Sequence, residues 1–131
     1  MRTSGWTDFV ERLVAGMGLA DRLGAAAPPR HPMMRPVVTV MPMRDGTRVF
    51  LDVTVLAREG AEKSHPHPAD GRLVQDLTSN FPFDPIDGET AGQAAARMEG
   101  LFTAAVGVMR AVWLNQPEVV ANGAVSPGGM Q

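Results

Sequence analysis

The sequence contains no cysteine, so disulfide bonds and thiolate metal sites are both excluded. Its 12 basic residues are interspersed with 14 acidic ones, and no basic block is present that could neutralise a phosphate backbone or an anionic membrane surface. No run of about 18 uncharged apolar residues occurs, so no membrane span is expected. These absences predict partners that are neither nucleic acid nor membrane.

Aromatic residues are also scarce. The chain has no tyrosine, five phenylalanines and two tryptophans, most of them in apolar patterns, which argues against a stacking surface for single-stranded nucleic acid. No dinucleotide-binding glycine motif, phosphate loop or nucleophile elbow is found. The sequence therefore predicts a protein that is not an enzyme and that carries no cofactor.

Charged residues interrupt the N-terminal segment at Asp8, Glu11, Arg12 and Asp21, which is not the pattern of a secretory signal. Together with the lack of cysteine, this favours a cytoplasmic location or incorporation into an assembled particle such as a virion. With 131 residues, of which 44% are apolar, the chain is expected to form one small domain.

Residues 7–23 predict an amphipathic helix, because apolar side chains recur there at steps of three and four. Thr7 is expected to cap its first turn, and Gly24 is expected to end it in the left-handed conformation. Gly16 and Gly18 weaken the middle of this helix by about 1 kcal/mol each, so it depends on packing for stability.

Residues 25–36 hold four prolines, which favour an extended arm. Such an arm is long enough to hold the first helix away from the rest of the chain. It is interpreted either as an inert linker or as an arm that lies on a neighbouring subunit. Met33 and Met34 are its candidate apolar contacts, because methionine adapts to irregular surfaces.

Residues 37–57 predict a β-hairpin, with β-branched strands at 37–43 and 47–57 around the tight-turn pair Asp45-Gly46. Pro42 places the first strand at an edge, because proline lacks a backbone donor. Two strands alone are marginally stable, so they need cover from a helix or from another subunit. Four side chains are expected on the apolar face: Val49, Leu51, Val53 and Val55.

Residues 58–89 are polar and rich in turn residues, and we expect a long loop with at most a short element at 72–77. His65 and His67 lie two apart, so in an extended segment both imidazoles could meet one metal ion. Asp70 and Asp76 lie nearby and His31 lies elsewhere, but no histidine and carboxylate pair sits on a helix to complete a site. A solvated loop is therefore the favoured interpretation. The acidic group Asp84, Asp87 and Glu89 does not have the spacing of a calcium loop.

Residues 90–115 predict a long helix, with Thr90 and Gln93 as a capping box, followed by a tail at 116–131 that includes a brief strand at 118–121. Large apolar side chains form one face of this helix: Met98, Leu101, Phe102, Ala105, Met109, Val112 and Trp113. Small residues form another: Gly92, Ala96, Gly100, Ala104, Gly107 and Ala111. Small side chains permit close approach of a second helix.

The sequence thus predicts an α+β fold: an N-terminal helix, a proline-rich extended arm, a β-hairpin, a long loop, and a long C-terminal helix with an extended tail. The apolar surface of the hairpin and the first helix is expected to be too small to cover the long helix, which favours a homo-oligomer or a subunit of a larger complex. The alternative is self-contained packing, with the small-residue face against the hairpin and the large-residue face against the helix at 7–23. The candidate interface residues are Trp6, Met33, Met34, Gly100, Ala104, Gly107, Ala111 and Trp113.

The leading hypothesis for function is a non-enzymatic structural subunit, most naturally in the shell, connector or tail of a virus- or phage-like particle. One alternative is a small metal-binding domain or enzyme that uses His65 and His67. A second alternative is a monomeric adaptor or chaperone that binds a peptide at the edge of the hairpin.

Overall fold

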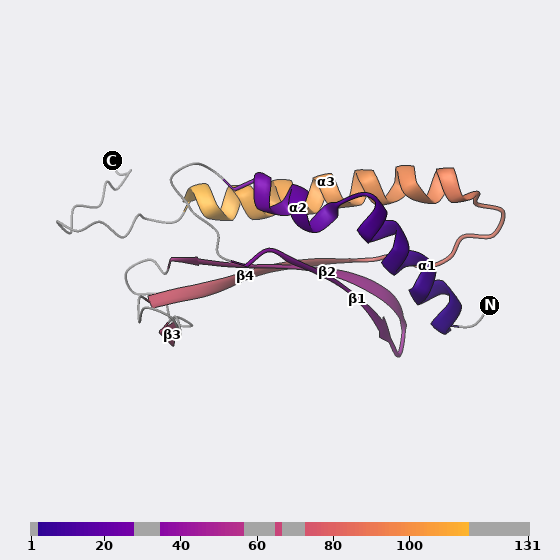
Figure 1. The fold of residues 1–131 in the computed structure, drawn as a ribbon, viewed down its shortest axis with the longest axis horizontal. Coiled ribbons are helices and arrows are strands. Elements are labelled where there is room, and N and C mark those ends of the chain that lie inside the picture. The colour runs from indigo at the N-terminus through magenta and orange to yellow at the C-terminus, as the bar shows by residue number, and fades with distance from the viewer. Residues whose placement is uncertain (1–2, 28–34, 57–64, 67–72, 116–131) are drawn as a thin grey trace.

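The computed structural model describes residues 3–27, 35–56, 65–66 and 73–115. In this part of the chain, helices cover one face of an antiparallel sheet, which confirms the α+β class (Figure 1). The sheet order is β1-β2-β4-β3. The elements are α1 (Thr3–Gly16), α2 (Leu19–Ala25), β1 (Val37–Met43), β2 (Gly46–Leu56), β3 (His65–Pro66), β4 (Leu73–Pro82) and α3 (Ala91–Asn115).

The predicted single helix at 7–23 is wrong in its middle, where the chain turns between α1 and α2. Gly18 is left-handed, with φ 65° and ψ 37°, a conformation that glycine adopts without a Cβ clash. The turn lays both helices against β1, so the proline arm does not hold them away from the body, although its length would allow it. Thr7 lies inside α1 and Gly24 inside α2, so neither acts at a helix end as predicted.

The predicted hairpin is confirmed, with β1 and β2 paired from Val37↔Asp52 to Met43↔Gly46. Gly46 has φ 139°, which L-residues rarely adopt, at the start of β2. β1 is an edge strand, as Pro42 indicates. The four side chains predicted for the apolar face are all at most 3% exposed: Val49, Leu51, Val53 and Val55.

The predicted loop at 58–89 is wrong over β4, which pairs with β2 from Leu56↔Val74 to Arg48↔Pro82. The positions of β4 opposite the buried residues of β2 are occupied by Phe81, Ser79, Leu77 and Gln75. Because two of these four are polar, the alternation that marks a half-buried strand is absent from the sequence. Residues 73–77 of the short element considered at 72–77 form the first half of this strand.

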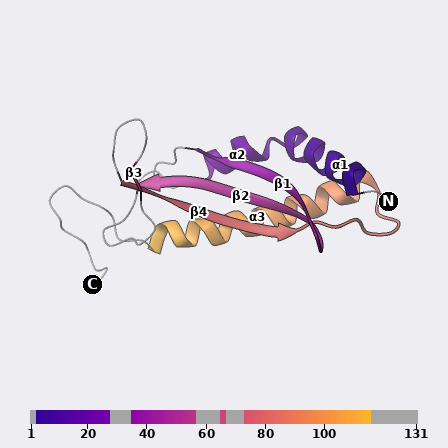
Figure 2. The same ribbon diagram turned by 90° about the horizontal axis from the view of Figure 1, so that it is seen from below.

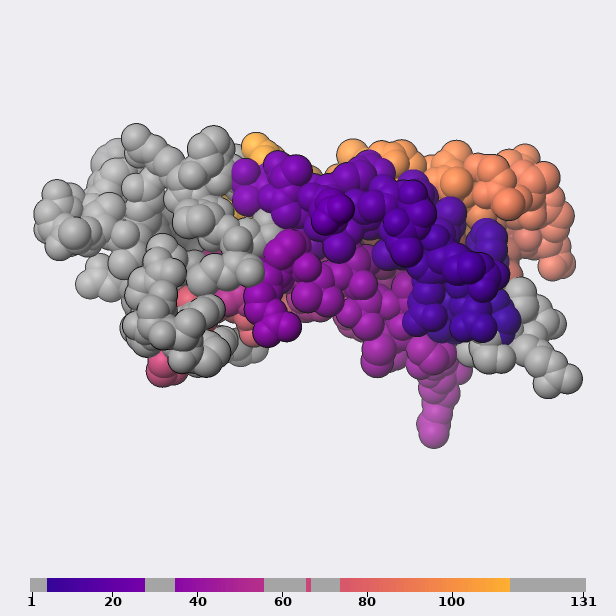
Figure 3. Space-filling view, in the orientation of Figure 1, coloured from indigo at the N-terminus to yellow at the C-terminus, as the bar shows by residue number. Residues whose placement is uncertain are grey.

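One cluster of buried side chains among the described residues joins α1, α2, α3 and the sheet. On α3 it includes most of the predicted large-residue face: Met98, Phe102, Ala105, Met109 and Trp113. The expectation that the chain cannot cover its own long helix is therefore wrong for this face, because β4 widens the sheet beneath it. Figure 3 shows α1 and α2 lying directly against the strands, with the β1–β2 turn projecting from the strands on the opposite side.

The arm at 25–36 lies mostly, and the tail at 116–131 wholly, outside the described residues, as does the strand predicted at 118–121. Among the helices that are described, none combines the length and the apolar character that crossing a membrane requires.

Candidate interaction surfaces

The N-terminus of α3 is fixed by the predicted capping box. The backbone N–H of Gln93 donates to the Thr90 hydroxyl at 3.1 Å, and the backbone N–H of Thr90 donates to the Gln93 side-chain oxygen at 2.8 Å. Two backbone N–H groups at this end of the helix thereby gain partners. The cap therefore marks the start of α3, which begins at Ala91, directly after Thr90.

Trp6, a predicted interface residue, lies in the core and is 8% exposed. Its indole stacks on Phe9 and on Phe83, with ring centroids 5.3 and 5.7 Å apart. Trp113, also predicted at an interface, is fully buried. The placement of both residues at an interface is therefore corrected: the neighbours that cover these indoles come from their own chain.

The carboxylates of the segment between β4 and α3 have partners within the chain. Asp84 Oδ1 accepts the Thr47 backbone N–H at 2.8 Å. Glu89 binds Arg97 through two hydrogen bonds of 2.8 and 2.9 Å, which lower the pKa of that carboxyl. The Arg97 guanidinium also lies 4.0 Å from the centre of the Phe83 ring. These contacts therefore connect the segment between β4 and α3 to β2 and to α3.

No group of three metal-ligating side chains comes together in the part of the chain that the structure describes. His65 belongs to the short strand β3, and its side chain lies outside the description. His67 lies outside the described residues altogether, as do Met33 and Met34. The hypothesis of a metal pair at His65 and His67 stays a prediction.

The predicted small-residue face of α3 is exposed along its whole length. A Cβ added at Gly100 or at Gly107 would meet nothing within 4 Å. Val108 and Val112 lie on the same side of the helix and are 61% and 43% exposed. Arg110, the only charged residue between positions 100 and 112, donates instead to the Ala26 carbonyl oxygen. The outer face of α3 over 100–112 is thus apolar apart from Thr103, and we call it the α3 outer face.

A second surface lies on the side of the sheet that the helices leave open. Side chains of β1 that alternate with the buried Val40 point there, and three are 38–43% exposed: Val37, Met41 and Met43. Asp52 of β2 shares this side and is half-buried. Burial, and secondarily the charge of Asp76, raise the pKa of the Asp52 carboxyl. The open side is therefore apolar along β1, and toward β4 it carries the acidic pair Asp52 and Asp76 together with Arg48 and Asn80.

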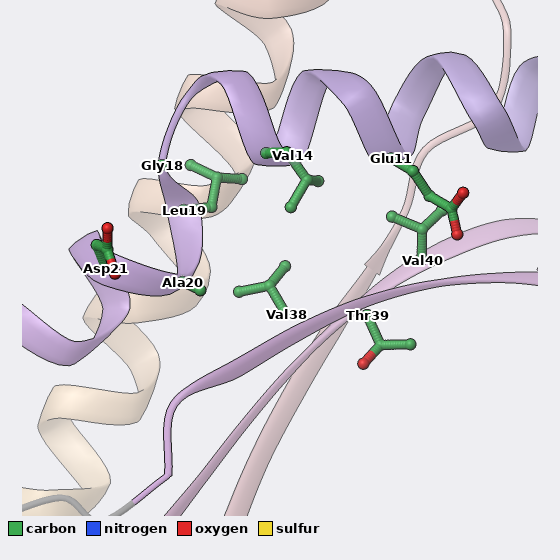
Figure 4. Close-up of a pocket in the computed structure, with 10 residues that line it drawn as sticks. Glu11, Val14, Gly18, Leu19, Ala20, Asp21, Val38, Thr39 and Val40 are labelled. Carbon is green, nitrogen blue, oxygen red and sulfur yellow. The ribbon is translucent and has the colours of Figure 1, made fainter.

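The third surface is a groove of about 480 Å³ between β1 and the turn that joins α1 to α2 (Figure 4). Apolar side chains of Val14, Leu19, Val38 and Val40 line it, with Glu11 and Asp21 also at its margin. The sequence does not predict this groove, because the groove depends on the left-handed turn at Gly18. The low helix propensity of Gly16 and Gly18 is the one local feature of the sequence that points to a turn here.

A further hollow of about 370 Å³ lies beside the start of α3. Its lining includes Trp6, Phe9 and Ile86, and Ile86 is 52% exposed. The polar side chains in its lining are Glu89 and Thr90. Glu89 is held by Arg97, and Thr90 caps the helix, so both already serve the fold.

Comparison of the chain with models of protein families, with curated proteins and with solved structures found no match in any of the three.

Proposed function

We propose that this protein is a non-enzymatic structural subunit that associates with a second copy of itself through the α3 outer face. The observation that carries the proposal is the run from position 100 to 112, in which no exposed side chain is charged. At 1.5 Å per residue this run is about 20 Å long. Exposed helix faces of monomeric proteins usually carry charged residues, so an uncharged face of this length favours a protein partner.

The small side chains support a helix as the partner. Gly100, Ala104, Gly107 and Ala111 recur at steps of three and four, which lets the backbone of a second helix approach closely. A second copy supplies the same small residues on its own α3, and two-fold symmetry then pairs like with like. We propose an antiparallel pair of α3 helices centred between Ala104 and Gly107.

The neighbouring charges define where this contact ends. Arg22 of α2 makes two hydrogen bonds, of 2.8 and 2.6 Å, to Glu99 of α3. Both side chains are more than 40% exposed and lie next to the start of the α3 outer face. This ion pair belongs to the polar rim that commonly surrounds an apolar contact. The particle setting expected from the sequence stays a prediction.

Cysteine cross-linking tests the proposal, because the natural chain contains no cysteine. Ala104→Cys places a thiol near the proposed two-fold axis, where two copies come within disulfide reach. The matched control is Ala91→Cys, exposed on the same helix but about 40 Å from its symmetry mate in this arrangement. Mild oxidation of the first variant yields a covalent dimer and of the second a monomer. Equal yields from the two variants, or no dimer from either, would contradict the proposal.

A further inference from the structure

The outer edge of β1 is available to another strand. β1 pairs with β2 on one side only, and among the described residues no strand pairs with its other side. The backbone of Val38 and Val40 has no hydrogen bond beyond the β2 ladder in that part of the chain. An edge of this kind presents N–H and C=O groups in the geometry that an incoming strand requires.

The hairpin register shows which residues present these groups. Thr47, opposite Pro42, donates its N–H to Asp84 and accepts from the Phe83 N–H, so this pair is not hydrogen-bonded within the hairpin. Because hydrogen-bonded and non-hydrogen-bonded pairs alternate in an antiparallel ladder, Val40 and Val38 also direct their backbone groups outward. Pro42 lacks an N–H, which confines the competent edge to the first half of β1.

The groove lies along this same edge. Val38, Thr39 and Val40 all line it, although the side chains of successive strand residues point to opposite faces. In Figure 4, Val38 and Val40 point toward the helices and Thr39 points away. The groove therefore follows β1 over these three residues, and it opens to solvent where the exposed Glu11 and Asp21 line it. Figure 2 shows α1 beyond the outer edge of β1. The helices therefore cover one face of the position that an added strand would occupy.

The helices beyond this edge restrict which kind of chain can pair with β1. A second copy that paired its own β1 antiparallel to this edge, about a two-fold axis perpendicular to the sheet, would bring its α1 and α2 to the same side of the sheet. The two helix pairs would then compete for the space beyond the edge. A single extended segment carries no helices of its own and meets no such obstacle.

The charges at the groove specify the chemistry of that segment. Glu11 and Asp21 lie toward opposite ends of the groove in Figure 4, and both are exposed. Neither has a hydrogen bond or an ion pair among the described residues. The apolar side chains of Val14, Leu19, Val38 and Val40 lie between them. We propose that β1 binds an extended segment of another protein as an added strand, with an apolar side chain in the groove and a basic side chain on either side of it.

A synthetic peptide with the sequence Thr-Lys-Thr-Val-Thr-Lys-Thr tests this proposal, because its lysine and valine side chains share one face and read alike in either strand direction. Titration of the full chain with this peptide, followed by calorimetry, is expected to show binding. A peptide with glutamate in place of lysine is expected to bind at least about tenfold more weakly. Equal affinity for the two peptides, or binding of neither, would overturn the proposal.

The variant Glu11→Arg/Asp21→Arg tests the charge assignment. Both positions are exposed, so the fold tolerates the change, and the preference is expected to reverse in favour of the glutamate peptide. Asp8→Arg, an exposed acid of α1 outside the groove, is the matched control and keeps the preference for lysine. A preference that does not reverse in the double variant contradicts the assignment.

Two backbone-methylated peptides test for strand addition itself. One carries N-methyl groups on the threonines and the other on the lysines and the valine, so each blocks one edge of the peptide. Exactly one of the two edges faces β1, and only the peptide blocked there loses binding. Equal affinities for the two would overturn strand addition. The variant Gly100→Leu/Gly107→Leu binds the peptide like the natural chain, because this site is independent of the α3 outer face.

Discussion

The indole Nε1 of Trp6 donates a 2.7 Å hydrogen bond to the backbone carbonyl oxygen of Phe83, 77 positions away in the sequence. This bond joins the first turns of α1 to the segment that follows β4. It is buried, and the two rings stack with an interplanar angle of 12°. The residue that the sequence assigned to a partner's surface therefore closes the protein's own core at the end where α3 begins.

Trp6→Phe removes this hydrogen bond but keeps an aromatic ring in the stack. The Phe83 carbonyl then loses its donor, and the free energy of unfolding is expected to fall by about 1–3 kcal/mol. Urea denaturation measures the change. Trp113→Phe is the matched control, because the Trp113 Nε1 is buried and has no hydrogen-bond partner in the described part of the chain. If the control costs as much as Trp6→Phe, the hydrogen bond to Phe83 is not the source of the effect.

Gly46→Ala is expected to destabilise the hairpin. At φ 139° an alanine is strained, and its Cβ would overlap the Asp84 carboxylate, which accepts the Thr47 N–H. We expect a loss of about 1–3 kcal/mol, measured by thermal unfolding. Gly16→Ala adds the same methyl group where nothing lies within 4 Å, at the end of α1. That control is expected to be neutral or to gain up to about 1 kcal/mol. A Gly46→Ala variant as stable as the natural chain would contradict this conformation of the β1–β2 turn.

Asp52→Asn is expected to stabilise the protein at neutral pH. The raised pKa means that the folded state binds a proton at Asp52 more tightly than the unfolded state does. The free energy of unfolding therefore falls as the pH rises from the ordinary aspartate pKa to the raised pKa of Asp52. Above that range the loss of stability stays constant. Asparagine carries no charge, so the two proteins are expected to differ at pH 7 and to converge in acid.

Urea denaturation from about pH 3 to pH 7 measures this convergence. Asp87→Asn changes the same chemical group at an exposed position and controls for the substitution itself. A stability difference between Asp52→Asn and the natural chain that is constant over this pH range would show that the charge of Asp52 is not responsible.

Gly100→Leu/Gly107→Leu is expected to weaken self-association and to leave the fold intact. Leucine fits at both positions within a single chain, and it has a higher helix propensity than glycine by about 1 kcal/mol. The larger side chains keep a second α3 helix from approaching closely. Analytical ultracentrifugation measures the mass, and circular dichroism checks the helix. Gly16→Leu, on an exposed position of α1, is the control, and unchanged association of the double variant would exclude the α3 outer face.

The elements that the sequence predicted correctly are those with local signals. The hairpin follows from β-branched strands around Asp45-Gly46, and the start of α3 follows from the Thr90 and Gln93 pair, whose two hydrogen bonds are present. Each signal involves residues within a few positions of one another, so no knowledge of tertiary packing is needed to interpret it.

The features that the sequence did not predict depend on tertiary contacts. β4 is a strand because β2 supplies its hydrogen bonds, although Gln75 and Ser79 occupy core-side positions. Without β4 the sheet appears too narrow to cover α3, and this led to the incorrect expectation about Trp113. The groove beside β1 likewise requires the turn at Gly18, where helix periodicity continues through the glycine.

The native mass of the natural chain over a dilution series tests the central claim most directly, namely that the chain folds alone and associates through the α3 outer face. We expect a dimer of the 14.0 kDa chain at high concentration. On dilution it is expected to dissociate into a monomer with an unchanged circular dichroism spectrum. A mass of 14.0 kDa at every concentration, or loss of helix when the assembly dissociates, would contradict the account.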